Sequence, residues 1–109
     1  MQKLTYFGDS NAVKFAPIQS DTIGVAALAA NTNKAVAIPA GARFVRMSLG
    51  AQFYYNPNNA AATIAGADAA TGGSVTVTPY ENPLICVDGL TNLNFIAPAA
   101  GVLSLEWFA

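Results

Sequence analysis

Hydrophobic and polar residues alternate with a period of two through most of this chain, which predicts β-strands with one face in a core. The longest example runs from residue 43 to residue 55, and its apolar parity contains Val45, Met47, Leu49, Ala51, Phe53 and Tyr55. Gly50 in its middle predicts a bulge or bend, so the segment could form two strands that turn a corner. Helix is expected to be scarce. Strands are predicted near residues 35–38, 43–49, 51–56, 74–78, 84–87, 92–97 and 102–108.

The alternation also predicts which side chains form the core. We expect ten residues to be buried: Val45, Met47, Leu49, Phe53, Ile85, Leu93, Phe95, Leu103, Leu105 and Trp107. The run from Leu84 to Val87 is apolar on both parities, which is typical of a central strand covered on both faces. Cys86 lies within this run, so we expect it to be a small buried hydrophobic residue rather than a reactive thiol.

Turn signals recur at a spacing of roughly 8–12 residues, which predicts an all-β, antiparallel sandwich or barrel. Pro39-Ala40-Gly41 suits a turn between two strands, and Asp88-Gly89 suits a tight hairpin turn with positive φ. For two segments the sequence allows more than one secondary structure. Residues 22–30 could be a strand or a short Ala-rich helix, and residues 59–70 could be a turn of helix or a long loop.

A chain of 109 residues is sufficient for one domain with its own core. The first part of the chain lacks the regular alternation of the later part. We therefore predict an irregular N-terminal arm over residues 1–20, which could reach a neighbouring molecule and become ordered on assembly, and a β-sandwich domain over residues 21–109.

The composition removes most kinds of catalysis. The chain has no histidine, one cysteine, five basic and six acidic residues. Catalytic triads and zinc sites normally need histidine or several cysteines. Four acidic residues lie in apparent turns, where aspartate caps its own backbone: Asp9, Asp21, Asp68 and Asp88. We therefore predict no enzymatic activity, no catalytic residue, no cofactor and no metal site.

Charge and hydropathy also limit the partners. The net charge is −1, and the basic residues are spread along the chain without forming a stripe for phosphates, so no nucleic-acid partner is expected. No apolar stretch approaches the roughly 20 residues of a membrane helix, so no membrane partner is expected, and no secretory signal is visible. So low a charge leaves little barrier to self-association, which favours a homo-oligomer.

Aromatic residues carry the one pattern typical of binding. Adjacent strand residues point to opposite faces, so Tyr54 and Tyr55 cannot both be in the core, and neither can Trp107 and Phe108. Tyr54 and Phe108 share the parity of the polar positions, which predicts either an exposed contact residue or a partly covered edge residue. Arg43 and Arg46 are expected to lie on a solvated face, and the alternative is a salt bridge to Glu81 or Glu106 across strands or subunits. The candidate interface residues are Tyr54, Tyr55, Tyr80, Arg43, Arg46 and Phe108.

The segment Ala35-Val36-Ala37-Ile38-Pro39-Ala40-Gly41-Ala42-Arg43-Phe44-Val45-Arg46 resembles one in small virion proteins of tailed bacteriophages. In those proteins a strand, a Pro-Ala-Gly turn and a strand with alternating arginines follow one another. The later order is also similar: the aromatic strand Gln52-Phe53-Tyr54-Tyr55-Asn56, a long Ala/Gly/Thr-rich loop, a short strand near Pro79, and the aromatic finish Leu103-Ser104-Leu105-Glu106-Trp107-Phe108. The resemblance spans about residues 35 to 108.

This resemblance implies a β-sandwich, often of the jelly-roll kind, without enzymatic activity. It also implies a place in the virion after assembly in the host cytoplasm, commonly as a trimer on a symmetric shell. The function expected from it is that of a capsid cement or decoration protein, which binds the major capsid protein between capsomers and stabilises the head. The alternative is a carbohydrate- or receptor-binding sandwich module of a phage tail or spike, with Tyr54, Tyr55 or Tyr80 as contact residues.

Overall fold

The computed structural model describes residues 1–3, 6–9, 12–17, 20–57 and 60–109, and this part of the chain is all-β without a helix. Two short strands come first, β1 (Tyr6–Asp9) and β2 (Ala12–Pro17). Eight further strands form the body: β3 (Thr22–Leu28), β4 (Lys34–Ala37), β5 (Phe44–Ser48), β6 (Phe53–Asn56), β7 (Val75–Val77), β8 (Leu84–Cys86), β9 (Asn92–Ile96) and β10 (Gly101–Phe108). Every predicted strand is present, and residues 22–28, left open between strand and helix, are a strand.

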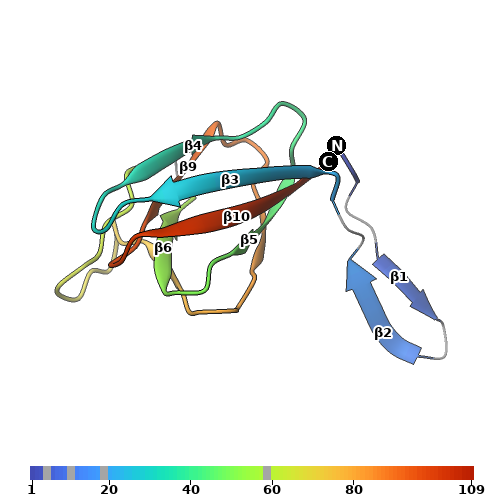
Figure 1. Ribbon diagram of the computed structural model, residues 1–109, viewed down its shortest axis with the longest axis horizontal. Coiled ribbons are helices and arrows are strands. Elements are labelled where there is room, and N and C mark those ends of the chain that lie inside the picture. Colours follow the sequence, from blue (N-terminus) through green and yellow to red (C-terminus); the bar gives the residue numbers. More distant parts are fainter. Residues whose placement is uncertain (4–5, 10–11, 18–19, 58–59) are drawn as a thin grey trace.

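The eight strands of the body form two antiparallel sheets of four (Figure 1). The first sheet has the order β3-β10-β5-β8, and the second has the order β4-β9-β6-β7. Strand β10 therefore lies in the middle of the first sheet, where Leu105 pairs with Gly24 of β3 on one side and Met47 of β5 on the other. Apart from β6 and β7, consecutive strands belong to different sheets, so most connections cross from one sheet to the other.

One core joins the two sheets. Nine of the ten residues predicted to be buried are in it: Val45, Met47, Leu49, Phe53, Leu93, Phe95, Leu103, Leu105 and Trp107. The tenth, Ile85, is only partly buried and packs at the margin of the core. The predicted corner at Gly50 is also confirmed, because β5 before it belongs to the first sheet and β6 after it to the second.

Strand β8 corrects the prediction of a central strand. It lies at the edge of the first sheet and pairs only with β5 among the described strands. An edge strand is covered less completely than a central one, which explains why Ile85 is half-buried and why the predicted burial of Cys86 is wrong, since that cysteine is exposed. The apolar run indicated a strand correctly, but its position in the sheet depends on distant partners.

The turn at Asp88-Gly89 is real but does not close a hairpin. The Leu90 amide donates to the Val87 carbonyl at 3.0 Å, and positive φ occurs at Gly89 but not at Asp88. The strands on either side, β8 and β9, belong to different sheets, so the turn carries the chain across the core. The predicted turn at Pro39-Ala40-Gly41 has the same function between β4 and β5, with Gly41 at φ 85°.

Residues 1–20 also differ from the predicted irregular arm, because β1 and β2 pair with each other as an antiparallel hairpin. The two strands form a sheet of their own, and Figure 1 shows this hairpin projecting from the end of the body at which both termini lie. An isolated two-stranded hairpin is at best marginally stable in water. Contact with another surface would therefore stabilise it.

The long loop before β7 contains no helix over its described residues 60–74, although it is rich in alanine. Ala62 of this loop is tied to the second sheet through Asn33. The Asn33 side chain accepts from the Ala62 amide at 2.8 Å and donates to the Asn94 side chain at 3.1 Å, which fixes the loop to β9. Ala62, Asn94 and Ile96 are buried, and Asn94 and Ile96 have the strand parity opposite to the core residues Leu93 and Phe95.

We predict that Phe95→Ala lowers the free energy of unfolding by about 3–5 kcal/mol, because this fully buried ring packs against Phe53 and its loss leaves a cavity. Urea unfolding followed by tryptophan fluorescence measures the effect. The control Val102→Ala removes an exposed side chain and should change stability by less than about 0.5 kcal/mol. A loss below about 1 kcal/mol for Phe95→Ala would contradict the described core.

Candidate functional site

Three of the candidate residues come together on the outer face of the first sheet. Arg46 of β5 lies opposite Glu106 of β10, and its guanidinium donates to both carboxylate oxygens, at 3.2 and 2.7 Å. The same guanidinium lies 5.7 Å from the ring centre of Phe108. The solvated face predicted first is therefore wrong for Arg46, and the alternative of a cross-strand salt bridge to Glu106 is confirmed.

Phe108 corrects a second expectation. Its parity matches Ser104 and Glu106, which face away from the core, yet its side chain is fully buried. The Arg46 guanidinium lies over the ring, and the Phe108 carbonyl accepts from the Arg43 amide at 2.8 Å. The alternation of the strand correctly predicted that this ring lies on the outer face of the sheet. It did not predict that the Arg46 side chain covers the ring.

Arg43 stays at the surface of the same region. Its guanidinium donates to Asp88 at 3.1 Å and lies 5.7 Å from the ring centre of Phe44, and more than half of both charged side chains is exposed. Asp88 thus pairs with an arginine in addition to occupying the predicted turn. We call Arg43, Arg46 and Phe108 the arginine cluster. The backbone amide of Arg43 and the guanidinium of Arg46 both contact Phe108, and each guanidinium is paired with a carboxylate.

The three tyrosines do not form a site with this cluster or with one another. Tyr55 is buried in the core, and burial raises the pKa of its phenol. Tyr54 is half-buried on the outer face of the second sheet, where its hydroxyl accepts from Gln52 at 3.2 Å. Tyr80 lies in the connection between β7 and β8, is 79% exposed and has a φ of 66°. Only Tyr80 retains the exposure expected of a contact residue.

The connection that carries Tyr80 is held by its neighbours. The Glu81 carboxylate accepts from the amide and the hydroxyl of Thr78, and these hydrogen bonds lower the pKa of Glu81. The Tyr80 amide donates to the Leu49 carbonyl at 3.5 Å. The Glu81 carboxylate therefore binds Thr78, and among the described contacts it does not form the salt bridge to an arginine that was the alternative.

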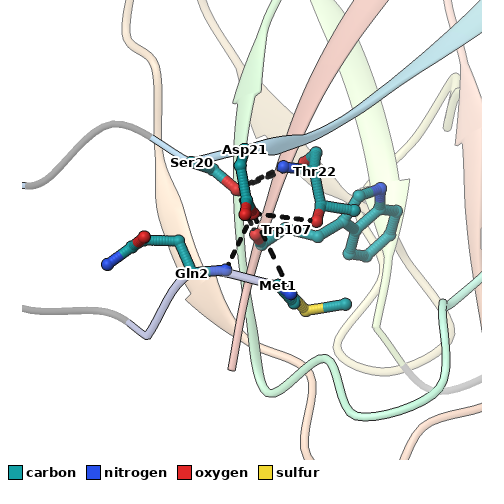
Figure 2. A network of polar contacts seen from close by, with 6 residues as sticks. All are labelled: Met1, Gln2, Ser20, Asp21, Thr22 and Trp107. Atoms are coloured by element: carbon teal, nitrogen blue, oxygen red, sulfur yellow. Dashed lines mark hydrogen bonds and ion pairs between the residues drawn. The ribbon is translucent and has the colours of Figure 1, made fainter.

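A polar network ties the N-terminus to the body, as Figure 2 shows. The Asp21 carboxylate accepts from the Thr22 hydroxyl and the Gln2 amide and lies 3.9 Å from the Met1 ammonium, and these contacts lower the pKa of Asp21. The buried Ser20 hydroxyl donates to the Trp107 carbonyl. Residues 1–2 and 20–22, which precede and follow the β1–β2 hairpin in the sequence, are thus held at one place on the body.

The first sheet has an exposed apolar surface that the alternation of the sequence did not predict. Ile23 and Val25 of β3 and Val102 of β10 are 62%, 67% and 60% exposed. The residues of β3 that face the core are Ala26 and Leu28. The sequence contained one signal for this surface, because β3 has apolar residues on both of its faces. Only one of these faces packs against the core, so the apolar residues on the other face are exposed.

Within the described residues, no group of three or more histidine, cysteine, aspartate or glutamate side chains could hold a metal ion, and no helix could span a membrane. Both guanidinium charges of the arginine cluster are balanced by the carboxylates of Asp88 and Glu106. The exposed apolar surface consists of aliphatic side chains, which have no reactive group. No family model, curated protein or solved structure matches this chain.

We predict that a double-mutant cycle of Arg46→Ala and Glu106→Ala gives a coupling free energy of about 1 kcal/mol or more, because the pair is bidentate and about one-fifth exposed. The matched cycle for Arg43 and Asp88, whose side chains are 59% and 56% exposed, should give less than about 0.5 kcal/mol. Chemical unfolding measures both. Equal coupling in the two cycles would contradict the distinction drawn here.

We also predict that Tyr55 makes the fold sensitive to alkali. Its raised pKa means that the unfolded chain releases the phenolic proton first, so its contribution to stability is complete below about pH 10 and is lost as pH rises further. Tyr55→Phe should flatten the fall in stability between about pH 9 and 11, as measured by urea unfolding across that range. An unchanged pH profile in Tyr55→Phe would show that this phenol is not desolvated.

Proposed function

We propose that this chain is a non-enzymatic virion structural protein of a tailed bacteriophage, of the capsid cement or decoration kind. It binds the major capsid protein between capsomers, and its place is in the virion. Each added contact between capsomers raises the free energy of shell disruption by mass action, because the protein binds the intact shell and not its separated parts.

The observation that carries this proposal is the strand order. Counted from β3, the first sheet has the order first, eighth, third, sixth, and the second has the order second, seventh, fourth, fifth. This is the order of a jelly-roll sandwich, and we propose that fold for the body. Jelly rolls are frequent in viral capsid proteins, although they also occur in lectins and cupins.

The surface supports the same proposal. The outer face of the first sheet has Ile23, Val25 and Val102 exposed, and its one arginine–glutamate pair is neutralised internally. Such a face loses little solvation energy when another protein covers it. We also propose that the protein acts as a homo-oligomer, for which the phage resemblance favours a trimer.

A second candidate function is a carbohydrate- or receptor-binding module of a phage tail or spike. The exposure of Tyr80 favours it, because an aromatic ring held in a fixed turn can stack on a sugar or on a partner protein. Tyr80→Ser separates the two functions. It should abolish binding to host polysaccharide if the second is right, and leave capsid binding unchanged if the first is right.

We predict that the purified protein co-sediments with expanded, DNA-free heads of its phage assembled without it, and that it raises their resistance to heat. A variant starting at Ser20 should remain folded but lose attachment, because the β1–β2 hairpin is paired with neither sheet and is free to dock on the shell. Ser20 is retained because it is buried and bonded to Trp107. Failure of the full chain to bind these heads would refute the proposed function, and unchanged binding of the truncated chain would refute the part played by the hairpin.

A further inference from the structure

Strand β3 is a long sheet edge without protection. It is seven residues long, lies at the end of the first sheet and pairs only with β10 among the described residues. Natural edge strands are usually blunted by charge, proline, a bulge or short length. The sequence Thr-Ile-Gly-Val-Ala-Ala-Leu of β3 has neither charge nor proline, and its pairing with β10 is continuous from Thr22 to Leu28.

The other three edges of the two four-stranded sheets are protected in these ways. Strands β7 and β8 are only three residues long, and Pro83 immediately precedes β8. Strand β4 is four residues long and begins with Lys34. The unprotected edge is thus confined to one side of one sheet, where it coincides with the exposed apolar surface. A row of free amide and carbonyl groups is complementary to another extended strand.

We propose that the edge of β3 pairs antiparallel with β3 of a second copy of this chain, around a two-fold axis at Val25. This register pairs all seven residues. It places Val25 opposite its own counterpart and Ile23 opposite Ala27. Side-chain parity is preserved across the axis, so the exposed apolar residues of both copies form one continuous face that also includes Val102 of β10.

The charges near the edge are compatible with this pairing. Glu106, opposite Ile23 on β10, is bound by Arg46, so it presents no free negative charge to the partner. Asp21 precedes β3, and the two-fold axis puts the two copies of Asp21 at opposite ends of the paired strands, about 27 Å apart at 3.4 Å per residue. No like charges therefore face each other across the axis among the described side chains.

The size of the contact determines its strength. One strand pair with three or four apolar side chains from each copy covers less than the roughly 800 Å² per partner of a standard stable interface. We therefore infer a dimer that dissociates on dilution. This inference rests on the homo-oligomer part of the proposed function and replaces the trimer that the phage resemblance favours by a dimer. It is tested without capsids, so that its failure is distinct from failure to bind heads.

Sedimentation velocity of the full chain between about 5 and 500 μM should show a reversible shift from monomer to dimer. Val25→Lys and Val25→Glu each place like charges opposite each other at the axis, and each should weaken association at least about tenfold. An equal mixture of the two variants should restore it, because unlike charges then meet. The control Ser48→Lys adds the same charge to the same face, two strands from the edge, and should associate like the original chain.

The restored mixture is the decisive result, because it requires residue 25 to face its own counterpart. Circular dichroism verifies that both variants fold, as expected for a side chain that is two-thirds exposed. A monomer throughout the concentration range, a trimer, or a mixture no stronger than the single variants would overturn the inference. The chain starting at Ser20 should dimerise unchanged, and loss of association there would assign the contact to the hairpin instead.

Discussion

The pairing of β10 with β3 on one side and β5 on the other is the interaction on which the rest of the structure depends. Strand β10 is the last strand of the chain, yet it occupies the middle of the first sheet. Its inward residues Leu103, Leu105 and Trp107 are at most 2% exposed and form the centre of the core. The first sheet cannot form without pairing between β3 and β10, which lie far apart in the sequence, so folding depends on contacts distant in sequence.

Period-two alternation was sufficient to predict every strand from residue 34 onwards and nine of the fifteen residues of the core cluster, because each strand has one face against that core. It could not predict which strands lie at edges, since this depends on pairing between distant segments. Ile85 and Cys86 were misjudged for that reason. Phe108 was misjudged because parity does not reveal a neighbouring arginine that covers an outward ring.

The candidate interface was predicted less well than the fold. Of the six residues, three gather in the arginine cluster, while Tyr54, Tyr55 and Tyr80 lie on the second sheet, in the core and in a turn. The exposed surface of β3 was missed because an apolar strand is normally assigned to the core. The two sheets differ in their outer faces, since Asn94 and Ile96 of the second sheet are buried, whereas Ile23, Val25 and Val102 of the first are exposed.

The central claim is that β10 holds the body together while the edge of β3 stays open for a partner. Residue-resolved amide hydrogen exchange at low and high protein concentration tests it most directly. The account predicts that β10 amides exchange slowest at both concentrations, and that the outward-directed amides of β3 exchange fast in dilute protein and become protected at high concentration. Slow exchange of all β3 amides in dilute protein, or protection that does not change with concentration, would contradict it.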